Sequence, residues 1–161
     1  MDELFKIIGD ERVSLARVDK DQFGNNPQLD KEQVKKSLEV KQKMSQINDK
    51  LEGASKEERI EWIRNMKDKG DVLYKEGKAQ QAMEVYLEGL MGVRDDLGAD
   101  FITEYKATVC SNMAMCALAQ QSAFRAQSLM NQALRVSPES HKVWLRQAIV
   151  HEHTRDYTAS L

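Results

Sequence analysis

Proline, aromatic residues and cysteine are all scarce in this sequence of 161 residues. It contains two prolines, eight glycines and two cysteines, and aromatic side chains make up only 6% of it. So few breaking residues, among many Lys, Glu, Gln, Ala, Leu and Met, predict an all-α fold and argue against a fold of strands and turns. The length predicts one domain with some additional chain.

An excess of charge of either sign is also lacking. Lys and Arg together number 24 and Asp and Glu number 26, which gives a formal net charge of −2. Nucleic-acid-binding proteins normally concentrate basic residues, so this balance predicts no nucleic-acid partner. The uncharged run over residues 107–124 approaches the length of a membrane span, but polar residues such as Asn112 and Gln120 interrupt it. It therefore predicts a buried helix and its turn, and no membrane association.

No pattern of catalytic residues stands out. Cys110 and Cys116 are six residues apart, so on a helix they point to different faces and are expected to be reduced thiols in a cytoplasmic protein. The segment HEHTR at 151–155 has Arg155 where a zinc-protease motif needs its second histidine. The glycines lack the Lys-Ser/Thr partner of a phosphate-binding loop. We therefore predict no enzyme activity, no metal and no cofactor.

The first third of the chain predicts helices with little apolar surface. Residues 1–20 are weakly helical, and Gly24 to Pro27 mark a loop within residues 21–30. Asp30 is expected to cap a helix over residues 31–51. This helix carries a narrow apolar stripe, which could pack on a neighbour, pair in a short coiled coil or belong to a charged linker helix: Val40, Met44, Ile47 and Leu51.

Five further helices are predicted in the rest of the chain. Ser55 followed by Glu58 forms a capping box that starts the first of them, and Gly77 is a good stop. The next four are expected over residues 80–96, 101–119, 123–136 and 140–153.

Pairs of small residues twelve positions apart recur along these predicted helices. The pairs are Gly70 with Ala82, Ala114 with Ala126, and Ala148 with Ser160. Such pairs fit the closest approach of two helices in a hairpin, with Tyr86 and Met130 as large apolar fillers four residues later. Ala114 and Ala148 are 34 residues apart, whereas Gly70 and Ala114 are 44 apart. The additional ten residues are expected in the loop at residues 92–100.

This register resembles the tetratricopeptide-repeat family, whose 34-residue pattern is W-x2-L-G-x2-Y, A-x3-F and P. The repeats are expected at about 63–96 and 107–140, with a truncated third from 141. The first keeps Gly70, Ala82 and Tyr86, the second keeps Ala126 and Pro138, and the third keeps Trp144. The resemblance implies a right-handed solenoid of antiparallel helix hairpins over residues 56–161, with 1–55 as an N-terminal helical extension or linker.

In that family the first helices of successive repeats line a concave groove that holds a partner's peptide. The resemblance places five residues in this groove: Lys67, Asp71, Asn112, Lys142 and Arg146. The set resembles the two-carboxylate clamp of co-chaperones and immunophilins, which binds the Glu-Glu-Val-Asp tail of seventy- and ninety-kilodalton heat-shock chaperones. Lysine, arginine and amide donors suit carboxylate ligands.

Asp71 departs from this pattern, because the family has asparagine at that position. An ionised aspartate only accepts hydrogen bonds and repels a ligand carboxylate. Two outcomes remain open. Asp71 could pair with Lys67 or Lys75 and leave the site, or the groove could prefer another ligand, such as one that brings its own cation.

The resemblance thus implies a cytoplasmic, co-chaperone-like adaptor that binds an acidic C-terminal peptide. The alternative is a scaffold that binds an unrelated peptide or self-associates through its helices, without chaperone binding. Because the third repeat is truncated, we expect the chain to be a fragment or short form of a longer protein. Otherwise a partner, a second copy or the N-terminal helix must cover an exposed apolar end.

Overall fold

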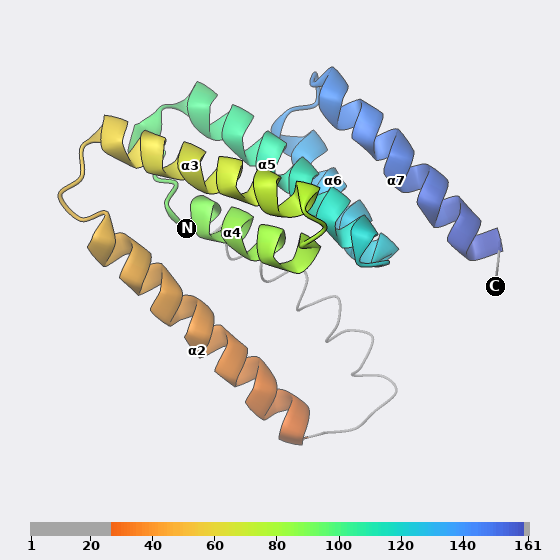
Figure 1. Cartoon of the computed structure of the whole chain (residues 1–161), viewed down its shortest axis with the longest axis horizontal. Coiled ribbons are helices and arrows are strands. Elements are labelled where there is room, and N and C mark those ends of the chain that lie inside the picture. Colours follow the sequence, from red (N-terminus) through yellow and green to blue (C-terminus); the bar gives the residue numbers. More distant parts are fainter. Residues whose placement is uncertain (1–26, 160–161) are drawn as a thin grey trace. The chain divides into compact units, whose positions relative to one another are not determined.

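The computed structural model describes the backbone of residues 27–159 and the side chains of residues 31–155, and this part of the chain is all-helical. It has no strand there, and its helices are α2 (Pro27–Lys50), α3 (Lys56–Lys75), α4 (Ala79–Met91), the 3₁₀ helix η1 (Asp95–Leu97), α5 (Ala99–Ala119), α6 (Ala123–Val136) and α7 (His141–Ala159) (Figure 1). The chain divides between Ala54 and Ser55 into two compact units, which we describe separately.

The first unit contributes the helix α2. It begins at Pro27, so the prediction that Asp30 caps a helix starting at residue 31 is wrong. Proline fits the first turn of a helix, because its fixed φ is helical and the N–H group it lacks has no partner there anyway. The predicted weak helix over 1–20 and most of the predicted loop lie outside the described residues.

The second unit begins with the hairpin of α3 and α4. The capping box is confirmed: the Ser55 hydroxyl accepts from the Glu58 backbone N–H at 3.1 Å, and the Glu58 carboxylate accepts from the Ser55 backbone N–H at 2.8 Å. Gly77, with φ +78°, allows the turn into α4. The helix predicted to run to residue 96 is shorter, because α4 ends at Met91 and η1 follows in the connecting loop.

The second hairpin, α5 and α6, shows where the additional ten residues of the first repeat lie. The bounds of α6 are as predicted, but α5 begins fifteen residues before Ala114, whereas α7 begins seven residues before Ala148. Most of the insertion is therefore two more helical turns at the start of α5, and the expectation that it lies in the loop is wrong. These two turns carry Phe101 and Tyr105.

The predicted close approach of small residues holds in both hairpins. Ala82, Ala114 and Ala126 are completely buried. A Cβ atom added at Gly70 would lie 2.4 Å from Cε1 of the Tyr86 ring, so the ring occupies the space that a side chain would need. The sequence register therefore identified where the helices touch.

The predicted third repeat differs from the structure in the length of its first helix. This helix, α7, does not end near residue 153 but continues to Ala159. No glycine or proline interrupts residues 141–159, so nothing local stops the helix. Within the described part of the chain no helix follows α7, so α7 has no hairpin partner like α4 or α6. Ala148 is consequently exposed, and Trp144 and Leu145 are 53% and 67% exposed.

Both cysteines lie on α5, which is buried on several sides. Both are free, as predicted, and both are completely buried. Burial raises the pKa of the Cys110 thiol to about 12 and that of Cys116 to about 11, so both thiols stay protonated and unreactive near neutral pH.

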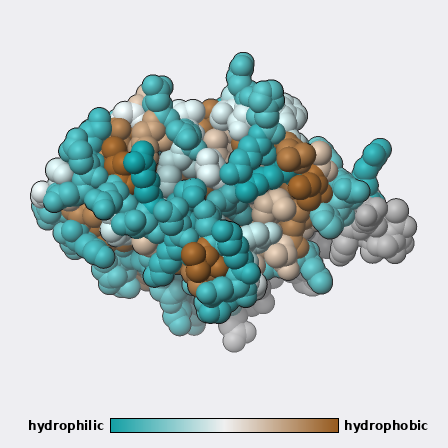
Figure 2. Space-filling view, turned by 45° about the horizontal axis from the view of Figure 1, so that its top comes forward, coloured by the Kyte–Doolittle hydropathy of each residue, from teal (hydrophilic) through white to brown (hydrophobic). Residues whose placement is uncertain are grey.

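The face of the molecule drawn in Figure 2 is mainly hydrophilic. Figure 2 shows teal side chains over most of the face in view, with the apolar ones in separate patches. None of the helices in the described residues has the length and apolar character needed to cross a membrane.

Candidate functional site

The carboxylate of Asp71 lies at the centre of a polar cluster on the second unit. Lys67, one turn earlier on α3, approaches Asp71 Oδ2 at 2.7 Å. The Tyr86 hydroxyl from α4 donates to Oδ1 at 2.5 Å, and the side-chain amide of Asn112 from α5 donates to the same oxygen at 2.9 Å. Three elements thus supply donors to one carboxylate.

Asn112 extends this cluster to α7. Its amide nitrogen faces Asp71, while its amide oxygen accepts from Nη1 of Arg146. The same Nη1 donates to the Ser111 hydroxyl at 2.6 Å. A single chain of hydrogen bonds therefore joins α3, α5 and α7, helices that lie far apart in the sequence.

Lys142, one turn before Arg146 on α7, lies beside this chain. It is exposed and has no ion pair among the described residues, but its charge is near enough to lower the pKa of Asp71. The i,i+4 spacing places Lys142 and Arg146 on one face of α7, as the sequence predicted.

Four of the five predicted groove residues are therefore hydrogen-bonded into one cluster. The fifth, Lys142, acts on the cluster through its charge, which lowers the pKa of Asp71. We call Lys67, Asp71, Asn112, Lys142 and Arg146 the polar row. Asp71 does pair with Lys67 and not with Lys75, yet the pairing keeps it inside the row. Pairing with Lys67 therefore does not take Asp71 out of the cluster, because Tyr86 and Asn112 hold the other carboxylate oxygen.

Two members of the cluster were missed by sequence reasoning. Tyr86 was expected to be an apolar filler, and its ring is buried, but its hydroxyl reaches Asp71. A buried tyrosine hydroxyl normally needs a hydrogen-bond partner, so the predicted burial of Tyr86 already indicated a polar group beside it. Ser111, which accepts from Arg146, had no distinguishing signal in the sequence.

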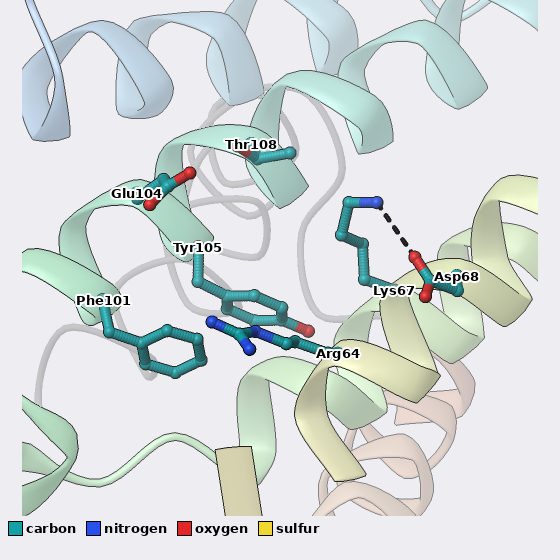
Figure 3. A pocket seen from close by; sticks show the side chains of 7 residues that line it. All are labelled: Arg64, Lys67, Asp68, Phe101, Glu104, Tyr105 and Thr108. Atoms are coloured by element: carbon teal, nitrogen blue, oxygen red, sulfur yellow. Dashed lines mark hydrogen bonds and ion pairs between the residues drawn. The ribbon is translucent and has the colours of Figure 1, made fainter. Parts of the chain in front are cut away.

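A pocket of about 250 Å³ lies next to the row, between α3 and α5, and shares Lys67 with it. Figure 3 shows Arg64 and Lys67 extending from α3 towards the rings and Thr108 on α5. The guanidinium of Arg64 lies 5.6 Å from the Phe101 ring centre, and Phe101 stacks on Tyr105. The additional turns of α5 therefore form one wall of this pocket.

The electrostatics of the Asp71–Lys67 pair favour the charged forms of both groups. Partial burial alone would raise the pKa of Asp71, but the bonds from Lys67 and Tyr86, with the charges of Lys67 and Lys142, lower it below 3.8 overall. The hydrogen bond to Asp71 raises the pKa of Lys67 above 10.5. Both groups are therefore ionised at neutral pH.

This pair predicts a particular acid sensitivity. Since the folded-state pKa of Asp71 is lowered, its stabilisation is present above pH 3.8 and is lost as the pH falls through the folded-state pKa. Asp71→Asn should therefore be less stable than the wild type at pH 7, and the difference should shrink below pH 3.8. Urea unfolding followed by circular dichroism at both pH values measures this. Asp68→Asn, which removes an exposed carboxylate 3.2 Å from Lys67, should stay close to the wild type; a deficit equal to that of Asp71→Asn would contradict the assignment.

Comparison with known proteins identifies no family for this chain. No family model, curated protein or solved structure matches the chain. The site is therefore interpreted from its own chemistry. Among the described residues, no group of three or more His, Cys, Asp or Glu side chains could hold a metal ion.

Proposed function

We propose that residues 55–161 form a protein–protein interaction adaptor that resembles tetratricopeptide co-chaperones and binds an acidic C-terminal peptide along the polar row. The observation that carries this proposal is the chain of hydrogen bonds from Lys67 through Asp71 and Asn112 to Arg146, with Lys142 exposed beside it. Cations and amide donors on three separate helices suit a peptide that lies across those helices. The buried free cysteines fit a reducing, cytoplasmic location, which is part of the proposal.

The α7 end of the row is best suited to a terminal carboxylate. Arg146 uses one nitrogen, Nη1, for its bonds to both Ser111 and Asn112. A guanidinium has five N–H donors, so others remain for a bidentate bond to a carboxylate. The ammonium of Lys142, one turn away, adds a second positive charge. We infer that the peptide terminus lies at this end.

The pocket beside Lys67 fits the residues that precede the terminus. It offers the apolar faces of Phe101 and Tyr105, the cations Arg64 and Lys67, and the carboxylates Asp68 and Glu104. Apolar side chains of a partner would match the two rings, and acidic ones would match Arg64 and Lys67. The acidic tail of a seventy- or ninety-kilodalton heat-shock chaperone has this chemistry.

The test is a titration with a peptide ending in Met-Glu-Glu-Val-Asp, compared with the same peptide as its C-terminal amide. We expect micromolar binding of the free acid, about −8 kcal/mol, and binding of the amide at least about tenfold weaker. Isothermal titration calorimetry measures both. Lys78→Ala, which removes an exposed lysine at the start of α4, serves as the control variant and should bind like the wild type. Equal affinity for acid and amide, or no binding of either, would reject the proposal.

A scaffold function is the second candidate, and the exposed face of α7 favours it. Trp144, Leu145 and Ala148 are exposed there, at the register where Gly70 and Ala114 pack against a second helix in the first two hairpins. A helix of a partner or of a second copy could occupy this face.

A further inference from the structure

The three donors around Asp71 are those that a bound carboxylate would require. Oδ2 accepts from the Lys67 ammonium, and Oδ1 accepts from the Tyr86 hydroxyl and the Asn112 amide. An ammonium, a hydroxyl and an amide converging on two oxygens form a complete carboxylate-binding arrangement. Here the carboxylate comes from the chain itself.

The position of Asp71 makes this arrangement more than a surface ion pair. The side chains of Asp71 and Lys67 are only 30% and 29% exposed, and Tyr86 is almost completely buried. Gly70 leaves the space that brings the Tyr86 ring against α3. Packing therefore fixes the Tyr86 hydroxyl, and the bond from Arg146 orients Asn112, so these two donors would remain in place if the carboxylate were removed.

We propose that Asp71 is an internal ligand of the polar row: its carboxylate occupies an anion-binding position formed by Lys67, Tyr86 and Asn112, and a partner's carboxylate can use that position only by displacing it. The peptide part of this inference depends on the proposed function, but the anion-binding position does not. In the wild type, a peptide carboxylate is then left with Lys142 and Arg146.

The anion-binding position can be tested without any peptide. Asp71→Ala should create a vacant site that a small carboxylate fills, so we expect sodium acetate to raise the melting temperature of this variant by about 4 °C more than sodium chloride of equal ionic strength. The wild type should show no difference between the two salts. Asp68→Ala, which removes the exposed neighbouring carboxylate, is the matched control and should behave like the wild type.

Each outcome of this experiment decides the inference. If Asp71→Ala does not fold alone, recovery of its helical circular dichroism by acetate but not by chloride supports the site equally. If acetate and chloride act alike on Asp71→Ala, or if acetate stabilises all three proteins to the same extent, the position does not bind anions and the inference is overturned.

A peptide experiment tests the displacement. Asp71→Asn should bind the free-acid peptide about tenfold more tightly than the wild type. Lys67→Ala should abolish this gain, so that Lys67→Ala with and without Asp71→Asn should bind the peptide within about twofold of each other. Lys75→Ala, an exposed lysine four residues on the other side of Asp71, should change neither. If Lys67→Ala weakens both backgrounds equally, Asp71 does not compete with the ligand. If no variant binds the peptide, the proposed function fails, while the acetate experiment still decides the role of Asp71.

Discussion

Replacing Gly70 by alanine should destabilise the unit of residues 55–161 by about 2 kcal/mol or more. The new Cβ would lie 2.4, 2.7 and 2.8 Å from three atoms of the Tyr86 ring. The ring is buried, so it cannot move aside as the end of an exposed side chain would. Gly→Ala inside a helix normally stabilises by about 1 kcal/mol, so the expected change has the opposite sign to that of a helix-propensity effect.

A double-mutant cycle shows whether the ring is the cause. Urea unfolding should be measured for Gly70→Ala in the wild type and in Tyr86→Leu, which removes the ring atoms that the Cβ would meet. The cost of Gly70→Ala should fall by about 1 kcal/mol or more in the second background. An unchanged cost would mean that the close approach of α3 to Tyr86 is not what requires glycine. Because the same ring carries the hydroxyl that binds Asp71, the packing of this hairpin also positions the polar row.

Local signals in the sequence located the ends of several helices. The capping box at Ser55 and Glu58, the positive φ of Gly77 and the α6 bounds all follow from residues within a few positions. Where the local signal was absent or ambiguous, the prediction failed. Pro27 permits both a loop and a first helical turn. The helix predicted to continue through Gly92 to residue 96 ends at Met91, whereas the next one begins within two residues of its predicted start.

The polar row could be predicted only in part, because its geometry is tertiary. The repeat register gave the helix face for Lys67, Asn112 and Arg146, and the structure brings them together. The direction of Asp71 could not be read from the sequence, since lysines lie four residues away on both sides of it. Asp71 pairs with Lys67 through one oxygen while its other oxygen accepts from Tyr86 of α4 and Asn112 of α5. The positions of these last two donors depend on how the two hairpins pack.

Arg146→Ala should weaken binding of the free-acid peptide about 30- to 100-fold, which corresponds to about 2–3 kcal/mol. The substitution removes the guanidinium that we place against the terminal carboxylate. It also leaves the amide oxygen of Asn112 and the hydroxyl of Ser111 without this donor. Arg146→Lys keeps the charge but loses the planar fork, so it should recover only part of the affinity.

Titration calorimetry with the acid and amide peptides measures this effect, and melting temperature separates it from unfolding. Arg135→Ala, which removes an exposed arginine from α6, is the matched control and should bind like the wild type. The decisive comparison is between the two peptide forms. If Arg146 binds the terminal carboxylate, Arg146→Ala should reduce the difference in affinity between acid and amide, because the amide never used that charge. A variant that is folded and weakens both peptides by the same factor would show that Arg146 supports the site through Asn112 and does not contact the ligand.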